Sequence, residues 1–301
     1  MSVGRICLGT AQLGMDYGVA NRHGRPDDAA CDQLLRFAMQ HGVRCWDTAP
    51  VYGDAETRIG RFLENHSAPQ APLLVSKLRP LPTDIDDDLI ATWVARELQS
   101  SLTRLRTRRL EVWLAHDPKS VLEPKGNVWR AMLDLQRQGI VTSIGVSVYR
   151  PEEALQALEL PGIGAMQLVL NLFDTRVIRT GVLQRCAQQG IRVFSRSAFL
   201  QGIFALTDQQ IPARLSFLRT PLNELRSELL PFNLSPMSAA IPFVLSQPEV
   251  DYLVLGVDSV EQLQENLVCA ETAFPSGLGE RIVEQFSTLA DEHLEPRYWP
   301  S

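Results

Sequence analysis

The sequence predicts a single (β/α)8 TIM barrel, in which eight parallel strands alternate with helices and close into a ring. Eight short runs rich in β-branched and aliphatic residues alternate with longer segments of helical period along the 301 residues. No linker, low-complexity tract or charge block divides the chain, so we expect one domain over residues 1–301. An open doubly wound sheet shares this alternation. Eight units, with no G-x-G-x-x-G motif after the first strand, favour the barrel.

The expected strands are short apolar runs at the spacing of βα units. They cover residues 5–8, 43–46, 73–76, 111–114, 143–146, 165–169, 192–195 and 252–255. The expected helices place apolar residues on one face between these strands. They cover residues 27–41, 86–106, 121–138 and 177–189, a short helix that begins at Pro151, and one that a capping box at Ser259 and Gln262 opens and that ends near Cys269.

Two segments lie outside the eight units or interrupt them. Residues 199 to about 236 are expected to form a long irregular loop after the seventh strand. In a barrel this loop lies at the catalytic end, and loops of this length are usually functional. The amphipathic residues 278–289 predict an extra C-terminal helix, which an aromatic tail follows at Pro296-Arg297-Tyr298-Trp299.

Composition narrows the class of protein. The net charge of −6 gives no electrostatic reason to expect nucleic acid or an anionic membrane as partner. No apolar stretch approaches the roughly 20 residues that a membrane span needs, and the N-terminus does not read as a signal peptide. The five cysteines are scattered without a C-x-x-C pair, so we expect free thiols in a cytoplasmic protein.

Polar side chains follow three successive strands where each strand ends, which in a barrel is the catalytic end. Asp47 follows the second strand, Lys77 the third and His116 the fourth, with Tyr52 five residues past Asp47. Alone, each is more often a capping, solvated or packing residue. Their conjunction predicts one site, because the strand ends of a barrel share one mouth.

These residue types suit the reduction of a carbonyl. Tyr52 can supply the proton, a nearby Lys77 favours the phenolate and lowers the tyrosine pKa toward working pH, and Asp47 can hold Lys77 by an ion pair. His116 can donate a hydrogen bond that orients the carbonyl oxygen. Oxidation of an alcohol runs the same path backwards. We expect no metal, since H-x-H and HExxH spacings are absent, and no hydrolase, since G-x-S-x-G is absent.

The sequence resembles the aldo-keto reductase superfamily over residues 8–266. The resemblance lies in Leu8-Gly9-Thr10-Ala11, Asp47-Thr48-Ala49-Pro50-Val51-Tyr52-Gly53, Val75-Ser76-Lys77, Leu114-Ala115-His116 and the segment from Leu255 to Asn266. It implies a barrel, a bound NAD(P)(H), and the tetrad Asp47, Tyr52, Lys77 and His116. The cofactor contacts that it implies are Gly9, Thr10, Asp47, Ser147, Gln167, Arg196, Ser197, Leu200, Gly202, Gly256, Val257, Asp258, Gln262, Glu265 and Asn266.

The chain departs from the pattern of that family at three places. Val148 stands where Asn is common, and Arg196 stands where an aromatic residue stacks on the nicotinamide. A guanidinium can also stack on a ring. Gln262 stands where an Arg often binds the 2′-phosphate of NADP, and Asp258 nearby would repel that phosphate. NAD(H) is therefore favoured over NADP(H), unless Asp258 is only the helix N-cap.

The expected partner is a small carbonyl or alcohol substrate. Tyr17, Arg22 and Asp117 indicate a polar, sugar-like substrate, although each is also a common kind of solvated loop residue. The alternative to an oxidoreductase is a nicotinamide-binding regulatory or sensor protein of the same fold, which would act on a protein partner. Val148 and Arg196 keep that alternative open.

Overall fold

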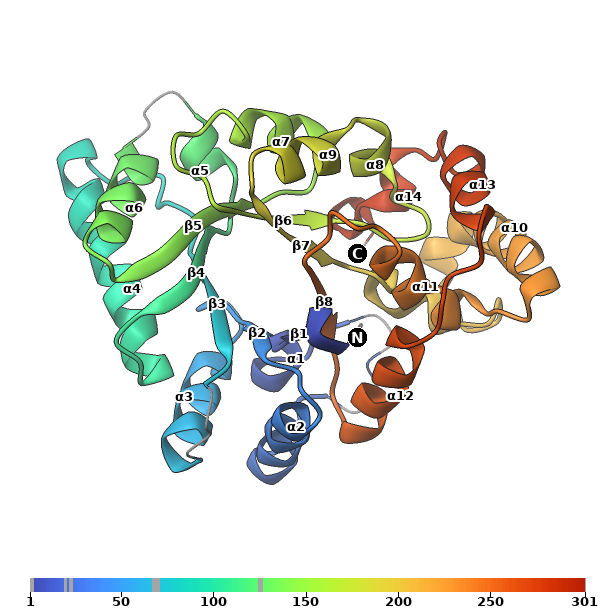
Figure 1. Cartoon of the computed structure of the whole chain (residues 1–301), viewed down its shortest axis with the longest axis horizontal. Coiled ribbons are helices and arrows are strands. Elements are labelled where there is room, and N and C mark those ends of the chain that lie inside the picture. Colours follow the sequence, from blue (N-terminus) through green and yellow to red (C-terminus); the bar gives the residue numbers. More distant parts are fainter. Residues whose placement is uncertain (1–2, 19–20, 22–23, 67–70, 124–126, 301) are drawn as a thin grey trace.

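The computed structural model describes residues 3–18, 21, 24–66, 71–123 and 127–300. Its eight parallel strands close into a barrel in the order β1 to β8, and helices surround the barrel (Figure 1). The strands are β1 (Ile6–Gly9), β2 (Cys45–Asp47), β3 (Leu73–Leu78), β4 (Leu110–Ala115), β5 (Val141–Ser147), β6 (Ala165–Val169), β7 (Arg192–Arg196) and β8 (Tyr252–Gly256). All eight expected strands and the barrel class are confirmed, and the first strand pairs with the last through Gly9 and Gly256.

The helices follow the strands as expected for βα units. They are α1 (Ala11–Gly14), α2 (Asp28–Gln40), α3 (Ala55–Asn65), α4 (Ile90–Leu105), α5 (Lys119–Leu122), α6 (Asn127–Arg137), α7 (Pro151–Ala157), α8 (Arg176–Arg179), α9 (Val182–Gln188), α10 (Arg219–Leu229), α11 (Pro236–Leu245), α12 (Val260–Ala270), α13 (Leu278–Gln285) and α14 (Asp291–Leu294). Short 3-10 turns are η1 (Val3–Arg5), η2 (Asp87–Leu89), η3 (Leu200–Ala205), η4 (Ala213–Leu218), η5 (Leu230–Phe232) and η6 (Pro296–Tyr298).

Two expected helices are each divided. The prediction over residues 121–138 is wrong in its continuity, because α5 ends at Leu122 and α6 begins at Asn127. The sequence between them carries Pro and Gly, the residue types least suited to a helix interior. The prediction over residues 177–189 fails at Gly181, whose φ of 72° separates α8 from α9. Apolar spacing that continues across a break conceals that break.

The segment after β7 is more regular than expected. It contains η3, η4 and α10, whose buried Leu222, Leu225 and Leu229 share one face. The helix α11 was not expected either, and eight of its ten residues are buried. A helix that is apolar all round has no period by which a sequence reveals it.

The core has two layers. Apolar side chains fill the barrel interior, among them Cys7, Cys45, Val75 and the aromatic Phe194, and a larger cluster packs the outer face of the strands against the helices. Each such apolar side chain contributes about 1.5–3 kcal/mol on burial. The rigid ring that results holds the eight strand ends, and the side chains that follow them, at fixed positions.

The expected C-terminal helix is found as α13, and α14 and η6 follow it. This end of the chain lies beside α8 (Figure 1), where Arg176 contacts Asp291 at 3.0 Å and Glu295 at 3.0 Å. The C-terminal segment thus packs on the loops that follow β5 and β6. In the described residues, no single helix is long and apolar enough to cross a membrane, although residues 213–232 and 236–245 meet that measure together as a pair bent by 78°.

Candidate active site

A buried ion pair forms the floor of the site. Asp47 ends β2 and Lys77 lies near the end of the neighbouring β3, so register brings the two side chains together. The Lys77 Nζ donates to Asp47 Oδ1 at 2.8 Å and Oδ2 at 2.7 Å, and to the carbonyl of Thr48 at 3.0 Å. Lys77 is 1% and Asp47 4% exposed. Burial alone would lower the pKa of Lys77, but the charges of Asp47 and Tyr52 outweigh it and raise that pKa.

Tyr52 lies above this pair in the loop after β2. Its ring centroid is 5.0 Å from the Lys77 Nζ. The loop rests directly on α1, because a methyl group at Gly14 would overlap the carbonyl oxygen of Tyr52, and Gly53 takes a φ of 56° against the same helix. Only glycine permits both the close approach and the positive φ.

The environment of Tyr52 corrects one expectation. Loss of solvent raises the pKa of Tyr52, and the opposing charge of Lys77 does not overcome that burial. The expected net lowering toward working pH is therefore not found. Tyr52 is protonated at neutral pH, which is the form that a proton donor needs.

His116 completes the tetrad. It follows β4, its backbone N–H donates to the carbonyl of Leu78 at 3.1 Å, and its ring lies edge-on to Tyr52 with centroids 5.8 Å apart. Burial, with the charges of Lys77 and Arg196, lowers the pKa of His116 to about 3. The imidazole is thus neutral at pH 7 and carries one ring N–H, which can act as a hydrogen-bond donor.

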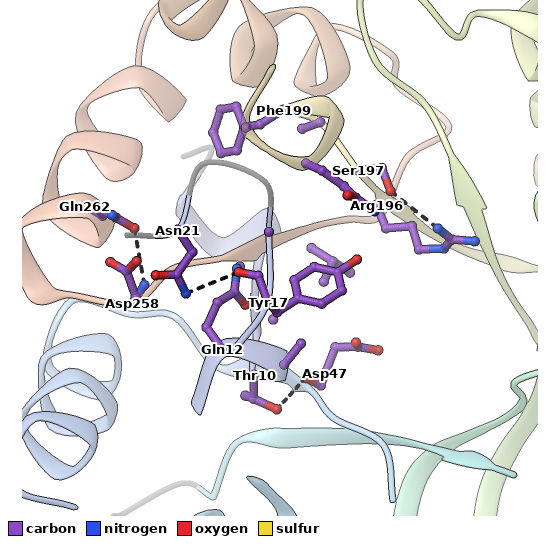
Figure 2. A pocket seen from close by; sticks show the side chains of 18 of the residues that line it. Thr10, Gln12, Tyr17, Asn21, Asp47, Arg196, Ser197, Phe199, Asp258 and Gln262 are labelled. Carbon is purple, nitrogen blue, oxygen red and sulfur yellow. Dashed lines mark hydrogen bonds between the residues drawn. The ribbon is translucent and has the colours of Figure 1, made fainter. Parts of the chain in front are cut away.

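The cavity at this mouth has a volume of about 520 Å³. Figure 2 shows Asp258 and Gln262 at one end, Arg196 and Ser197 at the other, and the ring of Tyr17 between them. Most of the predicted site residues line it, namely Gly9, Thr10, Tyr17, Asp47, Tyr52, His116, Gln167, Arg196, Ser197, Gly202, Gly256, Asp258, Gln262, Glu265 and Asn266.

Several predicted residues do not line this cavity. Lys77, Ser147, Leu200 and Val257 are buried around it. Asp117 lines a separate cavity of about 360 Å³, and its Oδ1 accepts from the backbone N–H of Lys119 at 3.2 Å. This hydrogen bond holds the Asp117 carboxylate in the short turn that follows β4, so Asp117 does not line the same cavity as His116. Arg22 lies outside the described residues.

Ser147 and Gln167 belong to the same network as the ion pair. Gln167 donates from Nε2 to Asp47 Oδ1 at 2.8 Å, and Ser147 donates to Gln167 Oε1 at 3.1 Å. Both are 1% exposed. This chain connects β5, β6 and β2 beneath the mouth, so these side chains fix the orientation of Asp47.

The loop after β7 is strained. Ser197, Leu200 and Gln201 have φ values of 65°, 47° and 54° without being glycine, and Gly202 follows with 89°. Each left-handed residue costs about 1–2 kcal/mol. Strain of this kind persists where packing enforces it and is concentrated at ligand sites. Ser197, Gln201 and Gly202 line the cavity.

The end of the cavity near α12 is acidic. Ser259 is the N-cap and accepts from the N–H of Gln262 at 3.3 Å, so the alternative that Asp258 is the N-cap is wrong. Gln262 turns its Oε1 to the N–H of Asp258 at 3.2 Å and not to that of Ser259, so the expected capping box is incomplete (Figure 2). Among the described residues at this end, Asp258 and Glu265 are charged and neither Lys nor Arg is present.

Some lining residues were not predicted from the sequence. They include Gln12, Asn21, Tyr149, Phe199, Gln201 and Met237. Tyr149 lies two positions beyond the end of β5, so the rule that strand ends meet at the mouth could have found it. Met237 is the second residue of α11 and gives no such signal, because that helix is not visible in the sequence pattern.

The residues present fit a nicotinamide dinucleotide. The cavity is lined by both polar and apolar groups, with Asp47 toward one end and Asp258 at the other (Figure 2), where a carboxylate can accept hydrogen bonds from ribose hydroxyls. The first turn of α12, capped at Ser259, presents backbone N–H groups toward that end.

The closed barrel gathers four polar residues at one mouth, which is where α/β-barrel enzymes place their active sites. A model of the Aldo/keto reductase family matches residues 5–284, so the chain belongs to that family. It is 26% identical to a D-threo-aldose 1-dehydrogenase from Pseudomonas sp. over 92% of this chain and 94% of that protein. It is 23% identical to a pyridoxal 4-dehydrogenase from Microbacterium luteolum over 98% and 95%.

Solved structures share the fold. An aldo-keto reductase from Bacillus halodurans, in its holo form, superposes with a TM-score of 0.76 at 18% identity, over 97% of this chain and 95% of that chain. A glycerol dehydrogenase from Gluconobacter oxydans gives 0.72 at 21% identity, over 94% and 90%.

Proposed function

We propose that this protein reduces aldehydes or ketones to alcohols, or runs the reverse reaction, with Tyr52 as the general acid. The observation that carries the proposal is the convergence of Tyr52, His116 and the Lys77–Asp47 ion pair at one barrel mouth. A bound nicotinamide would supply the hydride that reaches the carbonyl carbon.

Each residue of the tetrad has a distinct part in this proposal. Tyr52 donates its phenolic proton to the carbonyl oxygen, and burial keeps it protonated beforehand. His116 is neutral and donates a hydrogen bond that orients the same oxygen. Lys77, held by Asp47, stabilises the phenolate that Tyr52 becomes. In the oxidative direction the phenolate accepts the proton from the alcohol.

The preferred cofactor in this proposal is NAD(H). The acidic pair Asp258 and Glu265 suits ribose hydroxyls and repels a 2′-phosphate. Names of the relatives add a substrate class, since two of them are dehydrogenases of an aldose and of pyridoxal. We infer a small polar carbonyl or alcohol as substrate. Of the residues predicted to contact the substrate, Tyr17 lines the cavity.

A turnover assay tests the proposal. The purified protein should oxidise NADH in the presence of small aldehydes or keto sugars, with NADPH as the comparison. Tyr52→Phe should lower kcat by about 100-fold or more, because it removes the proton donor but not the ring. Its affinity for the cofactor should stay within about 2-fold by fluorescence titration, given that the aromatic surface is kept.

The regulatory alternative predicts a different result. A nicotinamide-binding sensor would bind NADH without turnover of any substrate, and Tyr52→Phe would then change nothing. The complete tetrad favours turnover.

A further inference from the structure

Arg196 ends β7 and is the only lysine or arginine among the described residues that line the cavity at the barrel mouth. We propose that its guanidinium binds an oxyanion of the substrate, a carboxylate or a phosphate, so that the protein prefers carbonyl compounds that carry such a group. The inference rests on the proposed carbonyl reduction and names its substrate class.

The guanidinium of Arg196 contacts neutral groups in the described part of the chain. Its Nη2 donates to the carbonyl of Val148 at 3.2 Å, its Nη1 donates to Ser197 Oγ at 3.3 Å, and its Cζ lies 4.1 Å from the ring centroid of Tyr149. No carboxylate of the described residues forms a salt bridge with it. Two of the five N–H donors of a guanidinium are thus used, and the others remain for a ligand.

The charges around Arg196 leave the substrate end of the cavity positive. Asp47 also lines this end, but Lys77 neutralises it through two hydrogen bonds. His116 is neutral because its pKa is lowered to about 3. The carboxylate of Asp258 lies at the far end of the cavity (Figure 2), and Glu265, which also lines the cavity, comes from α12 just after it. An anionic group is therefore attracted to Arg196 and repelled from the other end.

Arg196 lines the same cavity as Tyr52 and His116. Burial raises the pKa of Tyr52, and the positive charge of Arg196 opposes that rise. Burial lowers the pKa of His116, and the charge of Arg196 lowers it further. The hydroxyl of Tyr17 also lies within its field, although Tyr17 as a residue is 41% exposed. Tyr17 and Arg196 therefore border the space in which a carbonyl held by Tyr52 carries its other substituents.

The C-terminal segment holds Arg196 in place through Tyr149. Arg297 lies over the same tyrosine ring at 4.6 Å, and its Nε donates to Glu295 Oε2 at 2.6 Å. Glu295 is 1% exposed and also binds Arg150 at 3.1 Å, next to Tyr149 in the chain. A guanidinium that is positioned before the ligand arrives loses less conformational freedom on binding, which favours affinity.

The contact between Arg196 and Val148 bears on whether Arg196 binds the substrate or stacks on the nicotinamide. Positions 148 and 196 are both departures from the family pattern, and they contact each other through the hydrogen bond from Nη2. A guanidinium fixed on Val148 and on the ring of Tyr149 is held against the wall of the cavity. In the alternative role, Arg196 stacks on the nicotinamide and is a cofactor residue. The experiment must therefore distinguish binding of the substrate from binding of the cofactor.

Matched substrates separate the two roles. With NADH we would compare 4-carboxybenzaldehyde with methyl 4-formylbenzoate, and glyceraldehyde 3-phosphate with glyceraldehyde, because each pair differs mainly by the oxyanion. The wild-type protein should show a kcat/KM at least about 10-fold higher for one or both of the anions, as expected for charge-assisted hydrogen bonds. Which pair responds identifies carboxylate or phosphate.

Arg196→Gln should lower kcat/KM for the anion at least about 10-fold more than for its neutral partner, mainly through a higher KM, because only the anion loses a charge-assisted contact. Arg196→Lys, which keeps the positive charge, should retain part of the preference for the anion. This second variant also keeps the test possible if Arg196→Gln does not fold. Equal losses for the charged and neutral substrates, or a weaker Kd for NADH, would overturn the inference and assign Arg196 to the cofactor.

Failure of the proposed reaction itself would be visible separately. No turnover of either member of a pair refutes carbonyl reduction, and the anion site is then tested by titrating benzoate and inorganic phosphate into the protein with NADH bound. Binding that Arg196→Gln abolishes supports the site, and binding that the variant leaves unchanged, or no binding, refutes it.

Discussion

The buried imidazole of His116 should weaken the protein at acid pH, and His116→Gln should remove that weakness. The pKa of His116 is lowered from 6.5 to about 3 in the folded chain. Between these values the unfolded chain binds a proton that the folded chain does not bind. Stability that is present above pH 6.5 is therefore lost progressively as the pH falls toward 3.

The magnitude follows from the two pKa values. At pH 4.5 the unfolded imidazole lies two units below its pKa of 6.5 and is almost fully charged, whereas the folded one is neutral. At 1.36 kcal/mol per unit, this difference costs the folded state about 2.7 kcal/mol at pH 4.5 and almost nothing at pH 7.5.

Equilibrium urea unfolding at pH 7.5 and 4.5 measures this effect. The variant loses some packing of the ring, but that loss is the same at both pH values. The free energy of unfolding of the wild type relative to His116→Gln should therefore fall by about 2.7 kcal/mol between the two pH values. His41→Gln, which removes an exposed imidazole, is the control. A relative stability that changes by less than about 0.5 kcal/mol, near the additivity error of such comparisons, would refute a neutral buried His116.

Two further predictions concern the cofactor end and the Tyr52 loop. Asp258→Ser combined with Gln262→Arg should raise the ratio of kcat/KM for NADPH over NADH by at least about 10-fold, because a repulsive carboxylate is replaced and a cation added. Gln264→Arg, exposed on the same helix and outside the cavity, controls for added charge, and an unchanged ratio in the double variant would count against the NAD(H) assignment. Gly14→Ala should cost about 1–3 kcal/mol in urea unfolding and lower kcat, since the methyl displaces the Tyr52 carbonyl. Gly4→Ala, where nothing lies within 4 Å, should change neither, and a Gly14 variant with full activity would show that this packing does not position Tyr52.

The barrel and its tetrad could be predicted because each depends on short-range pattern. Strands of three to seven residues alternate with amphipathic helices, and the carboxyl ends of the parallel strands meet at one mouth of the barrel. Asp47 ends such a strand, Lys77 lies one residue before a strand end and His116 directly follows a strand, so their convergence needed no knowledge of distant contacts. By contrast, α11 has no polar face, and Gly181 interrupts a pattern that otherwise continues.

The protonation of the site could not be predicted in the same way. A lysine beside a tyrosine indicates a lowered tyrosine pKa, yet burial raises the pKa of Tyr52. The balance depends on how much solvent the surrounding loops exclude, and those loops come from several strands. The position of Asp117 could not be predicted either. Asp117 directly follows His116 in the chain, but it accepts a hydrogen bond from the backbone N–H of Lys119 and lines a different cavity.

The sequence by itself determined the fold class, the order of the strands and the residue types at the mouth, since these depend on composition and period along the chain. Only the tertiary structure decided the surroundings of Arg196. Val148 lies 48 positions before it in the chain, and Arg297, which contacts the same Tyr149 ring as Arg196, lies about a third of the chain after it. No local propensity encodes such contacts, because they exist only once the closed barrel has brought distant loops to one face.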